Sequence, residues 1–181
     1  MEITSHMIFK NALDWAKSII IALVIALLIR YFVFSPFVIP TGSMIPTIQV
    51  NDKIIALKFS YWLAPVKRDD IIVFRAPNGV RIPTPTGYKE NALLVKRVIG
   101  LGGETIEIKN GQLYINNVLQ SKPYIYEPIK QDFGPYTIPE DCYFVMGDNT
   151  NGSHDARSWK QRYITKDLII GKAVYKFGGL K

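Results

Sequence analysis

The longest apolar run of the chain lies near its N-terminus, where residues 18–29 read SIIIALVIALLI with no charged side chain. A helix that is apolar on every face is typical of a segment surrounded by lipid, whereas a surface helix has one polar face. The stretch Lys17–Phe34 would extend about 27 Å as a helix, close to the thickness of a hydrocarbon core. We therefore predict a membrane-spanning helix here, with Trp15 and Tyr31 near the two interfaces and Arg30 reaching outward to water.

Two other interpretations of this run are a buried core helix and a cleavable signal peptide. An all-apolar core helix would need a larger protein around it, and the residues after the run, RYFVFSPF, contain no small-x-small cleavage site. We favour an uncleaved anchor. Lys10 and Lys17 before the run indicate a cytoplasmic N-terminus, so the rest of the chain would lie on the outer face of the membrane.

After Pro36 the apolar positions follow short β-rich runs between turn signals. The clearest is residues 105–115, where alternating apolar positions flank Asn110-Gly111, a strong hairpin signal. The Pro- and Gly-rich residues 77–87 read as a mobile surface loop. We predict a mainly β chain, with a tail and anchor over residues 1–35 and an antiparallel β domain over 36–181. Further strands are expected at residues 70–75, 93–99, 142–146, 168–170 and 173–177.

Composition narrows the function classes. The 181 residues include 22 Lys and Arg against 15 Asp and Glu, a formal charge of +7, and one cysteine, Cys142. A single cysteine excludes an internal disulfide framework and a multi-cysteine metal site. The basic charge suits an anionic lipid surface, so it requires no nucleic-acid partner. No ligand spacing or phosphate-binding loop indicates a metal or another cofactor.

Three polar patches interrupt the apolar rhythm: Ser43 in the turn IPTGSMIP, Lys96 within LLVKRVIG, and the loop of residues 146–159. Each has an ordinary structural explanation, namely a Gly/Pro turn, a lysine at a sheet edge, and a solvated loop. Alternation places Lys96 on the strand face of Leu94 and Val98, where burial would lower the pKa of its amine. A Ser-His-Asp triad at residues 153–155 is disfavoured, because adjacent side chains point apart.

Taken together, the segments PTGSMIPT, KRDDIIVF, LLVKRVIGLGGETI and GDNTNGSHDAR resemble the sequence boxes of bacterial type I signal peptidases. The resemblance spans nearly the whole chain. It implies a serine endopeptidase with Ser43 as nucleophile and Lys96 as general base. It further implies that Ser153 holds the Lys96 amine, that Asp155 braces Arg157, and that Asp148 pairs with Arg97. The Ser43 N–H and the Thr41 hydroxyl are candidate donors to the oxyanion.

The resemblance also implies the partners: signal peptides of exported preproteins, with small residues at the first and third positions before the cut, and membrane lipid. A short inserted region would fall at about residues 105–140. The family pattern differs from this chain at Asp69, Thr150, Asn151, Gly152 and Lys160. The apolar residues implied to line the substrate pockets are Phe37, Ile39, Met44, Ile48, Leu94 and Val95.

Two functions of other classes are weighed against this one. A self-cleaving repressor shares the Ser/Lys chemistry, but it would carry a DNA-binding domain where this chain has its apolar run. A catalytically inactive, membrane-tethered peptide-binding homologue is the second, and the presence of both Ser43 and Lys96 weighs against it.

Overall fold

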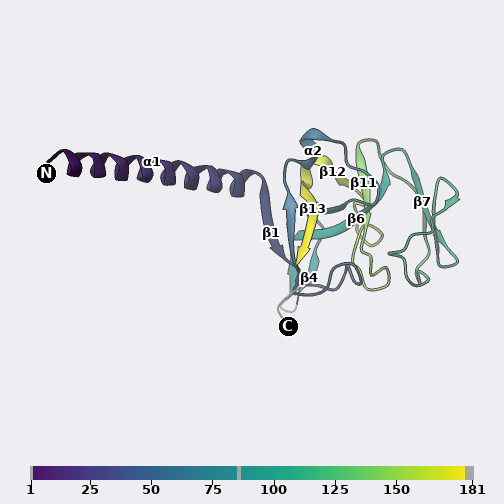
Figure 1. Ribbon diagram of the computed structural model, residues 1–181. Helices are drawn as coiled ribbons and strands as arrows, with labels where there is room; N and C mark the ends of the chain where they lie inside the picture. Colours follow the sequence, from purple (N-terminus) through teal and green to yellow (C-terminus); the bar gives the residue numbers. More distant parts are fainter. Residues whose placement is uncertain (1, 85–86, 178–181) are drawn as a thin grey trace.

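A computed structural model of the chain describes residues 2–84 and 87–177, and the side chains of residues 2–14, 31 and 32 lie outside that description. The side chains of Lys10 and Tyr31, used above for orientation and interface placement, fall in the part not described. The helix α1 (Glu2–Phe32) extends away from the β domain, as Figure 1 shows. Among the described residues, no helix combines the length and the hydropathy needed to cross a membrane.

The helix ends two residues earlier than predicted. Phe34 is the first residue of β1 (Phe34–Val38), which pairs antiparallel with β2 (Lys53–Leu57). The backbone N–H of Lys58 donates to the Val33 carbonyl at 3.0 Å and extends this pairing to the end of α1. Pro36 cannot donate a helical hydrogen bond, and pairing with β2 supplies the extended chain with partners instead. The β domain therefore begins at Phe34, directly after the helix.

The larger sheet has seven strands in the order β1-β2-β13-β3-β6-β11-β12, with every neighbouring pair antiparallel. The mainly β, antiparallel prediction is confirmed. The predicted strands at residues 70–75, 93–99 and 142–146 correspond to β3, β6 and β11, and residues 169–177 form one continuous strand. The remaining bounds are β3 (Ile71–Arg75), β6 (Leu93–Leu101), β11 (Cys142–Met146), β12 (Ile164–Thr165) and β13 (Ile169–Phe177).

Side-chain alternation along the central strands divides the apolar core between the two faces of this sheet. On one face Ile72, Phe74 and Val98 belong to a large cluster that also contains Cys142 and Trp159. On the other face Val73 packs with Met44 and with buried residues of β2 and of the segment between β1 and β2. The Met44 side chain and the large core therefore lie on opposite faces of the central strands.

A second sheet, in the order β10-β7-β8-β9, occupies the span where the family resemblance places an inserted region. Its central hairpin turns at Asn110 and Gly111, with φ of 52° and 77°, as the Asn-Gly signal predicts. Within the predicted mobile loop and just after it, the structure has two short strands, β4 and β5, that pair antiparallel. The bounds are β4 (Ile82–Thr84), β5 (Gly87–Lys89), β7 (Thr105–Lys109), β8 (Gln112–Ile115), β9 (Val118–Leu119) and β10 (Phe133–Thr137). Two short helices, α2 (Ser60–Leu63) and the 3₁₀ helix η1 (Lys166–Leu168), complete the fold.

Candidate active site

The turn that carries Ser43 is held against the sheet by its neighbours. Met44 is fully buried, at 0% exposure, and packs with Ile39 and Ile48 on the sheet face that also bears Val95. The backbone N–H of Ile39 donates to Asp52 at 3.0 Å, closing the segment between β1 and β2. Ser43 itself is only partly buried. The anchored side chains on both sides fix the backbone of a serine that stays open to solvent.

Lys96 lies in the middle of β6, opposite Ile72 of β3, and its side chain is 3% exposed. Because β6 has β3 on one side and β11 on the other, the alternative of a lysine at a sheet edge is wrong. Burial is the largest influence on the amine and lowers its pKa to about 8, although the negative charges of Asp155 and Asp148 oppose this shift. A substantial fraction of Lys96 is therefore neutral near physiological pH and able to accept a proton.

The loop after β11, residues 147–157, is organised by Asp155. This fully buried carboxylate accepts from the Gly147 N–H at 3.0 Å and from Arg157 Nε at 2.8 Å. Arg157 in turn donates to the Thr150 carbonyl at 2.6 Å. The brace between Asp155 and Arg157 that the resemblance implies is present, and it ties both ends of the loop together.

This loop contacts the Ser43 turn and lies beside Lys96. The Asn149 N–H donates to the Ser43 carbonyl at 3.1 Å, and the Asn149 amide donates to the Gly42 carbonyl at 3.1 Å. Gly147 is so close that an added Cβ would lie 2.3 Å from the Ser43 carbonyl oxygen. Asp155 of the same loop acts electrostatically on Lys96. One loop thus links the serine and the lysine, which belong to separate elements.

Two predictions about this loop have different outcomes. Ser153 Oγ is buried but has no hydrogen-bond partner among the described residues, so the implied bond to Lys96 is not formed here. The hydroxyl packs against the backbone of Gly147 instead, where an added Cβ would lie 2.4 Å from it. The disfavoured triad is also absent from the described loop, because His154 Nδ1 pairs with the Ser158 hydroxyl at 2.9 Å while Asp155 serves Arg157.

Arg97 points to the opposite side of β6 from Lys96 and makes a two-pronged ion pair with Asp148. Its Nε and Nη2 lie 2.7 and 2.6 Å from the two carboxylate oxygens, and the hydroxyl of Thr47 donates to the same carboxylate. Thr47 follows the Ser43 turn, so this pair connects β6, the loop and the turn a second time. The hydrogen bond from Thr47 was not expected from the sequence, since no local pattern relates residues 47 and 148.

Asp69 extends this network to the segment between β9 and β10. Its carboxylate accepts from Lys122 Nζ at 2.7 Å and from the Tyr124 hydroxyl at 2.6 Å, while its carbonyl accepts from Arg97 at 2.9 Å. The Arg97 guanidinium also stacks over the Tyr124 ring, 4.2 Å from its centroid. Asp69 has a φ of 71°, in the region that glycine adopts most easily, which explains why the family pattern has glycine at this position.

Two of the other departures from the family pattern make hydrogen bonds that hold the loop. Asn151 accepts from the Lys130 N–H at 2.9 Å and donates to the Pro128 carbonyl at 3.0 Å, so it connects the loop to residues 128–130. The Gly152 N–H donates to the Asn149 carbonyl and side chain. Thr150 is buried, and Lys160 is exposed. None of these changes breaks the contacts between the loop and the Ser43 turn.

The implied substrate-lining residues fall into three groups. Ile39, Met44 and Ile48 are buried in the core, while Phe37 and Val95 are partly buried against it. Leu94 packs with the large cluster on the opposite face, because alternation places it on the side of Lys96. Thr41 is exposed, two residues before Ser43. Within the described part of the chain, no cluster of three or more His, Cys, Asp or Glu residues could hold a metal ion.

Comparison with known proteins gives consistent matches. The profile of the family described as signal peptidase, peptidase S26, matches residues 12–177. The chain is 41% identical over 175 residues to signal peptidase I of Bacillus amyloliquefaciens, covering 91% of this chain and 87% of that protein. It is 39% identical over 165 residues to signal peptidase I of Leptolyngbya laminosa, covering 91% and 79% respectively. A crystal structure of a signal peptidase I from Enterococcus faecalis is 30% identical, covers 61% of this chain and 98% of that chain, and gives a TM-score of 0.49.

Proposed function

Because the chain belongs to the peptidase S26 family of signal peptidases, which makes it a hydrolase that removes signal peptides, we propose that Ser43 and Lys96 form its catalytic dyad. The observation that carries this proposal is the burial of Lys96, with a pKa of about 8, beside a loop that hydrogen-bonds to Ser43. A lysine in ordinary water would be protonated at neutral pH and could not serve as a base.

In the proposed reaction the neutral Lys96 amine takes the Ser43 hydroxyl proton as Oγ attacks the carbonyl carbon of the scissile peptide. The resulting oxyanion accepts hydrogen bonds from the Ser43 N–H and the Thr41 hydroxyl. As the intermediate collapses, the Lys96 ammonium returns its proton to the departing amine of the mature protein. Water, activated by the same amine, then releases the signal peptide from Ser43.

The supporting residues are proposed to hold Ser43 and Lys96 in position. Asp155 and Arg157 hold the loop, Arg97 and Asp148 fix it to β6, and Ser153 offers a buried hydroxyl that we propose as a hydrogen-bond partner for the Lys96 amine during the reaction. Phe37 and Val95, partly buried beside the turn, are proposed to line a shallow apolar surface for small side chains of the substrate. No metal or other cofactor enters the proposed mechanism.

Cleavage of a purified preprotein in detergent tests the dyad. Ser43→Ala and Lys96→Ala should each abolish cleavage while the protein stays folded. The matched controls Ser121→Ala and Lys89→Ala, at exposed positions, should cleave at the wild-type rate. Activity in either dyad variant would exclude its assigned role. A folded wild-type chain that cleaves no preprotein would favour the inactive peptide-binding homologue.

Thr41 allows a separate test of the oxyanion proposal. Thr41→Ser keeps the hydroxyl and should keep most of the activity, whereas Thr41→Val keeps the shape and removes the donor. Loss of one such donor lowers kcat by about 10²–10³-fold. KM should change little, because the ground-state carbonyl depends less on that bond. Valine turnover within about threefold of wild type would leave Thr41 with a backbone role alone.

We further propose that α1 anchors the protein in the bacterial cell membrane with the β domain on the outer face. The apolar side chains along Ile19–Ile29 are exposed all around the helix and have no partner layer in the described structure. Contact with water would make such a surface unfavourable, and lipid would remove that cost. An anchor of this kind would hold the Ser43 turn near substrates whose own apolar segments lie in the bilayer.

A further inference from the structure

A cavity of about 430 Å³ lies where α1 meets the sheet, away from the Ser43 turn. It is lined by Leu27 and Arg30 of the last turns of α1, by Phe34, Ser35 and Pro36 of β1, and by Lys58 after β2. The Lys58 N–H donates to the Val33 carbonyl at 3.0 Å, which fixes Lys58 beside the end of α1. Its size is within the range of small-molecule sites in proteins.

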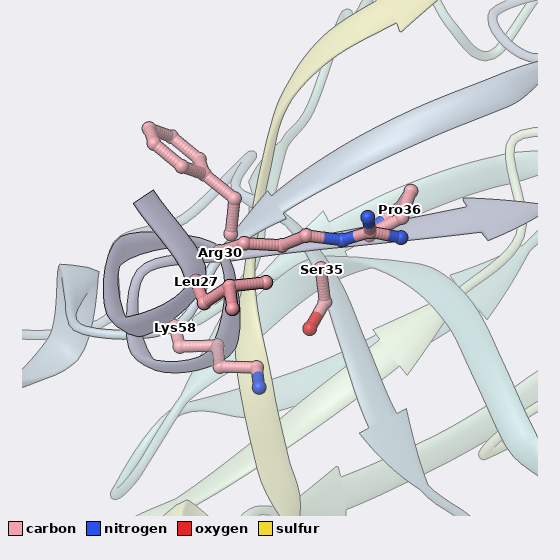
Figure 2. Close-up of a pocket in the computed structure, with 6 residues that line it drawn as sticks. Leu27, Arg30, Ser35, Pro36 and Lys58 are labelled. Carbon is pink, nitrogen blue, oxygen red and sulfur yellow. The ribbon is translucent and has the colours of Figure 1, made fainter. Parts of the chain in front are cut away.

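The lining combines two positive charges with apolar walls. Arg30 and Lys58 are basic, Ser35 offers a hydroxyl, the other three residues are apolar, and no acidic residue lines the cavity. Figure 2 shows the Arg30 side chain extended along β1 toward Pro36, with the Ser35 hydroxyl and the Lys58 amine beneath it in this view. A guanidinium and an ammonium beside a hydroxyl suit a phosphate, since the guanidinium binds two oxygens and the ammonium adds a point charge.

The position of the cavity identifies the source of the phosphate. Arg30 is the first charged residue after the apolar run of α1, so in an inserted helix it lies at the level of the lipid headgroups. Two residues beyond Lys58 begins α2, whose Trp62 and Leu63 are 82% and 80% exposed. Exposed tryptophan beside basic residues is typical of the membrane interface. A soluble phosphate would make no use of the apolar walls, whereas the glycerol backbone and first acyl carbons of a lipid would cover them.

We propose that this cavity binds the phosphate of one anionic glycerophospholipid from the outer leaflet, between Arg30 and Lys58, with its acyl chains along Leu27 and Phe34. The inference rests on the proposed insertion of α1. The bound lipid would join the anchor to the edge of the catalytic sheet, because one headgroup would contact α1, β1 and the end of β2.

Native mass spectrometry of the full-length protein in detergent tests this site with defined probes. Phosphatidylglycerol should be retained as one tightly bound molecule, phosphatidylcholine should bind at least tenfold more weakly, and diacylglycerol, which lacks the phosphate, should not be retained. Inorganic phosphate should compete only at concentrations far above those of the lipid. Inorganic phosphate that binds as tightly as phosphatidylglycerol would overturn the lipid assignment.

The double variant Arg30→Gln/Lys58→Gln should bind phosphatidylglycerol at least tenfold more weakly than wild type. The control Lys53→Gln/Lys89→Gln removes two exposed charges outside the cavity and should bind as wild type does. Equal losses in both variants, or no loss in the first, would overturn the site. Both double variants should still cleave a preprotein in detergent, which would show that they fold.

Alkaline carbonate extraction of membranes separates this inference from the anchor on which it rests. Both double variants should remain in the membrane pellet, because α1 keeps its apolar run. Extraction of the wild-type protein would contradict insertion of α1 and, with it, the lipid site. A membrane-integral wild type that retains no phosphatidylglycerol would contradict the lipid site alone.

Discussion

Lys96 has a low pKa because β6 is an interior strand whose face is covered by the large core. In the proposed dyad the neutral amine is the active form, so kcat/KM should rise with pH and level off above a pKa of about 8. Measuring cleavage of a peptide substrate from pH 6 to pH 10.5 checks this. A rate that climbs only above pH 10, or full activity in Lys96→Arg, would contradict the assignment of Lys96 as the base.

The same pKa has a consequence for stability. The folded protein releases the Lys96 proton at about pH 8, whereas the unfolded chain keeps it up to about pH 10.5. The unfolded state therefore binds more protons between these values, and the contribution of Lys96 to the free energy of unfolding rises with pH there. In Lys96→Met this part of the pH dependence should be missing from urea unfolding curves.

Asp69 gives a second residue-scale prediction. Burial alone would raise the pKa of its carboxyl, but the hydrogen bonds from Lys122 and Tyr124 outweigh burial and lower that pKa. Its stabilisation is therefore complete above the ordinary carboxyl range and is lost as the pH falls through the lowered value. Asp69→Asn keeps a residue that tolerates the positive φ and should cost about 1 kcal/mol at pH 7. Urea unfolding should show this gap closing as the pH falls through the lowered pKa of Asp69, where the carboxyl becomes neutral like the amide, whereas a gap independent of pH would contradict the charge-based explanation.

At the scale of elements, the sequence predicted what is encoded locally. The Asn110-Gly111 turn and the strands around Ile72, Lys96 and Phe144 follow from patterns within a few residues. The contacts of Asp148 with Thr47 and of Asp69 with Tyr124 join residues far apart in the chain, and no local pattern specifies them. The Ser43 and Lys96 positions were found through the family motifs, because a serine in a turn and a lysine in a strand are ordinary features.

The loop of residues 147–157 should depend on glycine at its first position. In Gly147→Ala the new methyl would meet the Ser43 carbonyl oxygen, a backbone atom that cannot turn aside, and would displace the turn or the loop. Misplacement of a catalytic group by about 1 Å costs on the order of 10²-fold in rate. We expect a kcat loss of that size at temperatures where the variant is folded.

Gly100→Ala is the matched control for this loop variant. Its methyl would lie 2.4 Å from Ile138 and 2.7 Å from Ile106, both side-chain atoms of the core. Such overpacking lowers stability by about 1–3 kcal/mol. Thermal melts should therefore show a lower Tm for Gly100→Ala, while its kcat below the transition stays near wild type. A Gly147→Ala enzyme with wild-type kcat would show that the loop does not position the Ser43 turn.

At the scale of the whole molecule, the proposed topology can be tested by protease accessibility. Protease added to intact spheroplasts should degrade the β domain and leave the N-terminal part of α1 protected. The motivation is the exposed apolar surface of α1 together with the basic residues that precede it. Full protection of the β domain in sealed spheroplasts, with degradation after lysis, would place that domain on the inner side and contradict the proposal.

The position of the last strand sets the order in which a newly made chain becomes active. In the seven-stranded sheet β13 lies between β2 and β3. The Ser43 turn is attached to β1 and β2, and Lys96 belongs to the group of β3, β6 and β11. Until Ile169–Phe177 has been synthesised, the sheet lacks the strand that joins these two halves. Before that point the proposed nucleophile and the proposed base would be held together by the loop of residues 147–157 and by the packing of Met44 on Val73, without the strand between the two halves, so we expect full proteolytic capacity only after β13 has been added.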